Sequence, residues 1–348
     1  MAREPFELAG TLIEPGERAT VGIPLPHQPS YTPMTMPVHV VHGKREGPAL
    51  FISAAIHGDE INGVEIVRRV LAAKSIGRLR GTLLCVPIVN VFGFLTHSRY
   101  LPDRRDLNRS FPGSPHGSMA SRLAHVFGEE IVKKCAFGID LHTGSSHRMN
   151  HPHIRANLDD GETKMLAEEF GTPVIINANL RDGSLRQFAS ELGIPMLLYE
   201  AGEALRFDAL AIKAGVTGIH RVMRAIGMLP ARTRKPRPRN VLIAKSSSWV
   251  RAPQSGIFRP SVALGARVRK EDTLGIVSDP IGTNEMSISS GITGIVVGYT
   301  RLPIINEGDA LFHIARFEDS KSVEAAIEAF HEEHIEGLGQ GDYTEVME

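Results

Sequence analysis

Residues 49–60 read Ala-Leu-Phe-Ile-Ser-Ala-Ala-Ile-His-Gly-Asp-Glu, an apolar run that ends in His57 and Glu60. An apolar run of this length is typical of a buried strand in a sheet. Open α/β sheets place their sites at strand ends, so His57 is expected at the edge of such a sheet. At the start of a helix, residues three apart share one face, and His57 and Glu60 could therefore hold one ion.

A second apolar stretch, residues 137–141, ends in His142. A single His-x-x-Glu motif more often makes a surface hydrogen bond, but a further histidine at a second strand end favours a metal site. Two nitrogens and one carboxylate leave the fourth position open, as in a catalytic zinc site. Asp140 lies two residues before His142 and points to the same side of the strand. It is predicted to orient the imidazole of His142 instead of binding the metal.

The pattern of apolar residues predicts an α/β fold in which helices flank a mixed sheet. Helical spacing appears at residues 64–71 and 120–134, and residues 81–89 read as a strand. This alternation places the catalytic domain at residues 48–231. Residues 1–47 carry short strand-like pieces between proline-rich turns, and they are predicted to pack on the catalytic domain.

The chain changes character after the catalytic segment. Residues 232–240 combine cations with prolines, which favours a stiff solvated linker over an anion-binding patch. Residues 241–317 are predicted to form a smaller all-β domain. Residues 255–257 recur as 290–292, and residues 268–277 are echoed by 305–314, a duplication that resembles the halves of a biotinyl/lipoyl-like sandwich. Residues 318–348 are expected to form an acidic helix and a polar tail.

Two further motifs complete a family pattern. Asp106-Leu-Asn-Arg and Tyr199-Glu-Ala-Gly, taken with the histidine motifs, resemble the succinylglutamate desuccinylase/aspartoacylase family of zinc carboxypeptidase-like amidohydrolases over roughly residues 48 to 230. The resemblance implies one zinc per chain, with the ligands His57, Glu60 and His142. It also implies that Glu200 is the general base.

The resemblance assigns the substrate contacts to arginines and one asparagine. Asn108 and Arg109 match the pair that grips a substrate carboxylate, and Arg186 matches a further substrate-binding arginine. Arg99 matches the arginine that assists at the scissile carbonyl. Residues 101–105 form a longer segment than the family has at this point, so Arg104 and Arg105 compete with Arg99 for that role.

The chemistry of two of these residues suits the assignments. The planar fork of Arg109 can make two parallel hydrogen bonds to a carboxylate, and this role is favoured over an ion pair with Asp106 or another acid. Glu200 follows the apolar run at residues 194–199, which predicts a buried strand end and a shifted pKa.

Three more histidines, His147, His151 and His153, follow the third ligand in a polar stretch. They could form a second metal site, but a substrate-facing loop or a solvated turn is favoured because no carboxylate or cysteine joins them at ligand spacing.

Composition limits the possible partners. Lys and Arg together number 39, and Asp and Glu also number 39, which removes a whole-chain electrostatic argument for nucleic acid or anionic membranes. Cys85 and Cys135 lie in apolar surroundings and read as reduced core residues. The first residues lack the order of a signal peptide, so the expected location is the cytoplasm. A homo-oligomer remains possible.

The sequence thus predicts a zinc-dependent hydrolase that cleaves the amide bond of an N-acyl amino acid. Two alternatives stay open. One is a metallocarboxypeptidase that acts on short peptides or glutamyl tails, and an open cleft beyond the metal would favour it. The other is a non-catalytic protein that binds a small ligand through the same fold. The identity of the acyl group and of the amino acid does not follow from these motifs.

Overall fold

The computed structural model describes residues 3–26, 30–231, 242–317 and 320–335. The linker predicted at residues 232–240 and the tail predicted beyond residue 335 lie outside these described residues.

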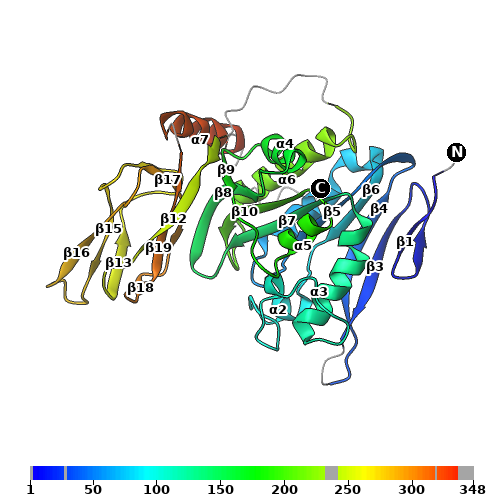
Figure 1. The fold of residues 1–348 in the computed structure, drawn as a ribbon, viewed down its shortest axis with the longest axis horizontal. Coiled ribbons are helices and arrows are strands. Elements are labelled where there is room, and N and C mark those ends of the chain that lie inside the picture. The colour runs from blue at the N-terminus through cyan, green and yellow to red at the C-terminus, as the bar shows by residue number, and fades with distance from the viewer. Residues whose placement is uncertain (1–2, 27–29, 232–241, 318–319, 336–348) are drawn as a thin grey trace.

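One large mixed sheet runs through the molecule and carries helices on both faces (Figure 1). Its strands follow the order β12-β19-β17-β8-β10-β7-β5-β6-β4-β3. In chain order they are β3 (Arg18–Leu25), β4 (Met34–His42), β5 (Arg45–Ala54), β6 (Arg80–Val86), β7 (Phe137–Gly144), β8 (Arg148–Ala156), β10 (Met196–Glu203), β12 (Ser246–Arg251), β17 (Gly294–Thr300) and β19 (Ala310–Arg316). Three shorter strands join beside this path: β9 (Val174–Asn177), β11 (Leu242–Ala244) and β14 (Arg267–Val268). This architecture confirms the predicted α/β fold class.

The parallel centre of the sheet decides where the site lies. Strand β7 pairs in parallel with β5 on one side and with β10 on the other. The strands on either side of this centre, β8 and β4, run antiparallel to their neighbours β10 and β6. The carboxyl ends of β5, β7 and β10 therefore meet at one edge, as expected for a site in an open α/β sheet.

Two hydrophobic cores cover the faces of the sheet. On one face lie α1 (Asn62–Ala72), α4 (Gly161–Phe170) and α6 (Ala209–Ala225). On the other lie α3 (Met119–Glu130), α5 (Leu185–Glu191) and the hairpin of β1 (Phe6–Leu8) and β2 (Thr11–Ile13). The short α2 (Val91–Leu95) and the 3-10 turns Lys74–Arg78, Leu107–Arg109 and Val132–Lys134 connect the larger elements.

The helices form where apolar residues recur at helical spacing. Helix α1 buries Ile66, Val67 and Val70 against the sheet, which fits the prediction for residues 64–71. The helix predicted over residues 120–134 is shorter in the structure. It ends at Glu130, and a separate 3-10 turn follows at Val132–Lys134.

The C-terminal strands form a sandwich. A second sheet, in the order β16-β15-β13-β18, packs on β12, β19 and β17 around a core of its own. Its strands are β13 (Gly256–Pro260), β15 (Thr273–Ser278), β16 (Glu285–Ser289) and β18 (Ile304–Ile305). The sequence duplication appears here as the matching pairs β14–β15 and β18–β19. The short strand of each half pairs with a strand of the other half: β14 pairs with β17, and β18 pairs with β13.

The two parts of the chain share hydrogen bonds next to the site. Strand β17 pairs with the start of β8, with Gly298 opposite Asn150 and Thr300 opposite Arg148. Helix α7 (Ser320–Ile335) lies beside β17, and its Phe330 joins the core under α6. The C-terminal strands are thus positioned to contribute side chains to the site. No helix among the described residues is long and apolar enough to cross a membrane.

Candidate metal and active site

The first motif lies in a turn and not in a helix. Strand β5 ends at Ala54, and helix α1 begins only at Asn62. The backbone N–H of Glu60 donates to the carbonyl oxygen of His57 at 3.1 Å, so residues 57–60 form a tight turn. The first and last residues of such a turn also lie close together, which is why the predicted pairing of His57 with Glu60 survives without a helix. A side chain at Gly58 would meet the backbone of Gly93 at 2.0 Å, so only glycine fits this turn.

Three buried side chains converge at the end of the parallel strands. The Nδ1 atom of His57 lies 2.7 Å from Oε1 of Glu60, and Nδ1 of His142 lies 2.8 Å from Oε2 of the same carboxylate. One donor atom from each residue falls within 4.8 Å of the other two. The two imidazoles and the carboxylate therefore present an N, N, O set to a single point.

Carboxylates hold the outer nitrogens of both imidazoles. Nε2 of His142 lies 2.7 Å from Asp140, which also accepts a hydrogen bond from the hydroxyl of Ser53 at 2.7 Å. Nε2 of His57 lies 3.1 Å from Asp106, the first residue of the Asp-x-Asn-Arg motif. The contact of Asp140 with His142 was predicted from the sequence, whereas the equivalent contact of Asp106 with His57 was not.

The charges of the site change the ionisation of its groups. Burial opposes protonation of His142, but Asp140 and Glu60 outweigh it and raise the pKa of this histidine well above its usual value. Burial likewise opposes ionisation of Glu60, yet the two histidines hold its pKa well below the usual range. The carboxylate of Glu60 is therefore ionised, and its negative charge stabilises the protonated forms of the two histidines beside it.

This donor set fits a divalent metal. Both histidines turn Nδ1 inward and Nε2 toward a carboxylate, the arrangement of metal-ligating histidines in carboxylate–histidine–metal sites. Two imidazole nitrogens and one carboxylate oxygen are a ligand set that zinc accepts with a coordination position left over. His57, Glu60 and His142 would be the residues that hold such an ion.

Glu200 lies beside this group on the neighbouring strand. The parallel register of β10 and β7 sets Glu200 level with His142. Its Oε2 accepts a hydrogen bond from the amide of Asn150 at 2.9 Å. Burial raises the pKa of Glu200, and the negative charge of Glu60 adds to the effect although His142 opposes it. A carboxyl group with such a pKa next to a metal site is suited to carry a proton.

Arg99 is the arginine that reaches the metal-ligand group. Its Nη1 donates to Glu60 at 3.1 Å and its Nη2 to Asp106 at 3.0 Å. Arg104 and Arg105, the other two arginines considered for this role, are exposed and do not line the cavity. Arg105 pairs with Asp103 at 3.9 Å instead.

The proposed carboxylate grip also reaches the cavity. Asn108 accepts the backbone N–H of Leu185 at 2.9 Å through Oδ1, which leaves its amide nitrogen as the end that a carboxylate would meet. Arg109 lines the cavity and does not pair with Asp106, which binds Arg99 and His57. Arg186 lines it as well, but it donates to the backbone carbonyls of Ala178 and Asn179 at 3.2 and 3.1 Å.

A cavity of about 250 Å³ opens over these residues. Among the described residues, only two acidic ones, Glu60 and Glu200, line it. The arginines that line it are six: Arg99, Arg109, Arg148, Arg155, Arg181 and Arg186. Such a wall attracts anionic ligands and disfavours cationic ones.

Part of the cavity wall comes from the C-terminal strands. Trp249 of β12 stacks on His313 of β19, with ring centroids 4.6 Å apart and planes 7° apart. The guanidinium of Arg148 lies 5.1 Å from the centre of the same indole ring. All three side chains line the cavity, and none of them was predicted from the sequence to do so. Their contact depends on the pairing of β12 with β19 and of β17 with β8, which no local motif indicates.

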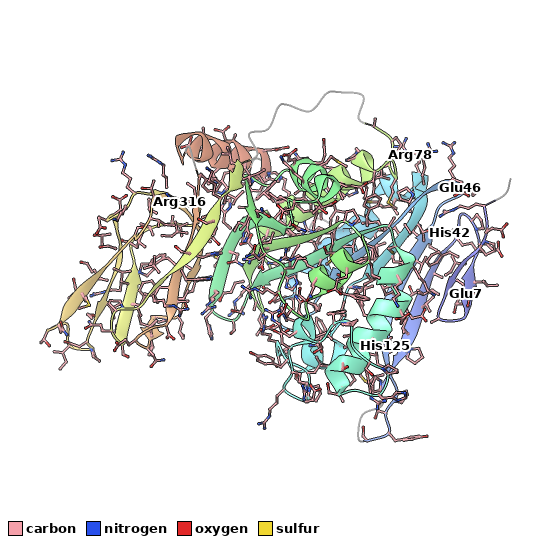
Figure 2. The ribbon with its side chains drawn as sticks, viewed as in Figure 1. Glu7, His42, Glu46, Arg78, His125 and Arg316 are labelled. Carbon is pink, nitrogen blue, oxygen red and sulfur yellow. The ribbon has the colours of Figure 1, made fainter. Side chains whose placement is uncertain are left out.

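His147, His151 and His153 lie in three different environments. Residues Arg148–Ala156 form strand β8, so the loop or turn favoured for this stretch is wrong over this range. His147 is exposed, whereas His151 is buried with its Nε2 3.2 Å from Nε2 of His331 on α7. His153 alone lines the cavity. No metal-ligating group among the described residues includes them. His125, to which the sequence assigned no role, projects from α3 outside the cavity lining (Figure 2).

Comparisons with known proteins identify relatives of this chain. A model of the succinylglutamate desuccinylase/aspartoacylase catalytic domain matches residues 46–226. N-alpha-acetyl-L-2,4-diaminobutyric acid deacetylase of Halomonas elongata is 26% identical over 299 residues, which cover 82% of this chain and 86% of that protein.

Two solved structures share the fold. A succinylglutamate desuccinylase/aspartoacylase from Rhodobacter sphaeroides superposes with a TM-score of 0.78 at 23% identity, over 87% of this chain and 95% of that one. The product-bound ectoine utilization protein EutE (DoeB) from Ruegeria pomeroyi gives a TM-score of 0.78 at 24% identity, over 86% and 95% of the two chains.

Proposed function

This chain belongs to the succinylglutamate desuccinylase/aspartoacylase family, and we propose that it is a zinc-dependent hydrolase that cleaves the amide bond of small N-acyl amino acids. The observation that carries the proposal is the buried His57–Glu60–His142 group, which faces a cationic cavity with Glu200 beside it. The deacetylase of Halomonas elongata, whose name describes amide cleavage in an N-acetyl amino acid, supports the reaction type.

The residues of the chain divide the reaction between them. When bound, zinc supplies Lewis acidity, which lowers the pKa of water and polarises a carbonyl group. Glu200 takes a proton from the attacking water, whose oxygen adds to the acyl carbon. As the carbon–nitrogen bond breaks, Glu200 returns the proton to the leaving amine. Arg99 reaches over the ligand group and stabilises the negative charge that grows on the carbonyl oxygen.

Asn108 and Arg109 would hold the substrate by the carboxylate of its amino acid. Arg109 offers two parallel donors and Asn108 a third from its amide nitrogen, a set that matches the planar carboxylate. Fixing this end of the substrate would align its amide bond with Glu200 and Arg99. Asp140 and Asp106 would orient the two histidines through their outer nitrogens.

The size of the cavity favours amino acid derivatives over peptides. A cavity of about 250 Å³ is at or below the small end of ligand pockets, and Trp249 and His313 narrow it. The carboxypeptidase alternative needs room beyond the metal for several residues. A non-catalytic binding role would leave unexplained why Asn150 holds Glu200 beside the ligand group.

The proposal is tested by metal-dependent release of amines. We expect purified protein to hold one zinc per chain and to lose activity when a chelator removes it, with recovery on adding zinc. A panel of N-acetyl and N-succinyl amino acids, assayed beside short peptides for free amine, should show cleavage of the first two classes only. Zinc-loaded protein that releases amine from none of these compounds would rule the function out.

Replacing Arg109 with lysine is expected to raise KM by about tenfold and to leave kcat nearly unchanged. Lysine keeps the charge but lacks the two-pronged fork, and an interaction present in both ground and transition states acts through KM. Steady-state kinetics on one cleaved N-acyl amino acid would measure this. Arg104→Lys is the matched control, since Arg104 is exposed and outside the cavity lining. An unchanged KM in the Arg109 variant would remove this residue from the carboxylate grip.

A further inference from the structure

Two cavity-facing residues of β8 take no part in the proposed reaction. His153 and Arg155 are two positions apart, so they lie on the same face of the strand, and both line the cavity. The register with β10 sets His153 opposite Glu200 and Arg155 opposite Leu198. The Cβ atoms of directly opposed residues in an antiparallel pair lie about 5 Å apart. The two residues therefore flank the position of the proposed general base.

His153 faces the cavity with an unsatisfied acceptor. Its Nδ1 lies 2.8 Å from the backbone oxygen of His151. A carbonyl oxygen can only accept, so Nδ1 carries the proton and Nε2 is left with a lone pair. Among the described residues, Nε2 of His153 has no hydrogen-bond partner although it is buried. Burial, together with the nearby Arg155 and His313, lowers the pKa of His153 to about 3, which keeps this ring neutral.

Arg155 offers the opposite chemistry on the same strand face. Its guanidinium can only donate, and among the described residues it has no hydrogen bond and no close ion pair, although the charge of Glu200 acts on it. Burial lowers the pKa of Arg155, and Arg181 adds to the effect although Glu200 opposes it. Arginine nevertheless remains charged in proteins. The cavity thus holds a donor-only group beside an acceptor-only atom, and neither has a hydrogen-bond partner among the described residues.

We propose that His153 and Arg155 form a specificity subsite for a primary carboxamide on the substrate, an inference that rests on the proposed function. A carboxamide oxygen would accept from Arg155, and its N–H would donate to Nε2 of His153. A carboxylate has no proton to offer the histidine. An ammonium group has no acceptor for the arginine and would enter a cavity lined by six arginines.

The subsite belongs to the amino acid half of the substrate. Arg109, Arg155 and Arg181 all line this cavity, and the charge of Arg181 lowers the pKa of both Arg109 and Arg155. Arg109 is the residue proposed to hold the carboxylate of the amino acid. Its side chain would then extend toward Arg155 and His153. The substrate class is accordingly an N-acyl derivative of asparagine or glutamine, in contrast to the diaminobutyric acid derivative in the name of the Halomonas elongata relative.

The first test compares side chains of similar size on the zinc-loaded full chain. N-acetyl derivatives of asparagine, glutamine, aspartate, 2,4-diaminobutyrate and norvaline are assayed for kcat and KM. The carboxamides are expected to exceed norvaline in kcat/KM by at least roughly tenfold, the usual weight of one well-placed hydrogen bond or more. Diaminobutyrate should be the poorest substrate. A preference for norvaline, aspartate or diaminobutyrate over both carboxamides overturns the proposal.

The second test removes the acceptor. His153→Leu should reduce the preference for carboxamide over norvaline by roughly tenfold, mainly through a higher KM for the carboxamide substrates. His153→Gln, which keeps an acceptor oxygen, should retain part of the preference and controls for damage to β8. Arg155→Met should reduce the discrimination against diaminobutyrate. The thermal midpoint of each variant is measured beside wild type, and an unchanged preference in folded His153→Leu contradicts the subsite.

A binding measurement separates the subsite from the reaction. Calorimetry with free asparagine, glutamine, norvaline and 2,4-diaminobutyrate reports the amino acid half without any cleavage. If no N-acetyl compound is cleaved while asparagine or glutamine binds best and His153→Leu abolishes that preference, the proposed function fails and the subsite stands. If N-acetyl compounds are cleaved but the free amino acids bind equally to wild type and to His153→Leu, the subsite fails alone.

Discussion

Replacing Glu200 with glutamine is expected to lower kcat by at least about 10²-fold, the usual size of a general acid–base contribution. Glutamine keeps the shape of the side chain and can still meet the amide of Asn150 through its oxygen, which now accepts a hydrogen bond at 2.9 Å. It cannot take up a proton. Single-turnover and steady-state rates on one cleaved N-acyl amino acid would measure the loss.

The zinc content of this variant decides how the loss is interpreted. Glu200 lies outside the group of atoms that converge for the metal, so metal analysis of Glu200→Gln should still give one ion per chain. Glu203→Gln is a matched control, because Glu203 ends the same strand, pairs with Arg301 and does not line the cavity. Loss of zinc together with activity would instead make Glu200 a ligand or a structural residue.

His142→Ala is expected to weaken zinc binding by more than 10²-fold and to abolish measurable turnover. Changes in groups that only orient a ligand typically cost about 10- to 100-fold in metal affinity, so removing a ligand should cost more. Competition with a chromogenic chelator would give the affinity of the variant relative to wild type. A variant that binds zinc as tightly as wild type contradicts the assignment of His142.

Folding must be checked in the same variant, because His142 also neutralises buried charge. Its ring lies between Asp140 and Glu60, and both carboxylates are almost fully buried. Removing the ring leaves them without this partner, which destabilises the fold. Asp140→Asn provides an intermediate case, since it keeps the ligand and should weaken zinc by about 10- to 100-fold. His116→Ala, at an exposed position outside the cavity lining, should change neither property.

Local sequence patterns predicted the elements that carry the metal site. The apolar runs before His57 and His142 are strands β5 and β7, and the run before Glu200 is β10. A buried parallel strand needs apolar residues at nearly every position, so its signal is strong over a short window. The convergence of His57 and Glu60 followed from their spacing alone, although a turn produces it where a helix was expected.

Strand β8 shows why the rest of the site could not be predicted. Arg148, His153 and Arg155 of this strand face a polar cavity, and the strand also contains Pro152. Neither face of the strand therefore shows an apolar pattern in the sequence. A strand that lines a binding site lacks the alternation by which strands are recognised. Trp249 and His313 were missed for another reason. They reach the cavity through pairings between segments far apart in the chain, which depend on the whole fold.

The junction between β17 and β8 has a consequence for solubility. Strand pairing there covers the main-chain N–H and C=O groups of residues 148–150, and β11 does the same for β9. A chain ending before residue 242 would leave both stretches as open sheet edges, and unpaired edges recruit strands from other molecules. The C-terminal strands therefore protect the catalytic sheet from self-association as well as narrowing the cavity.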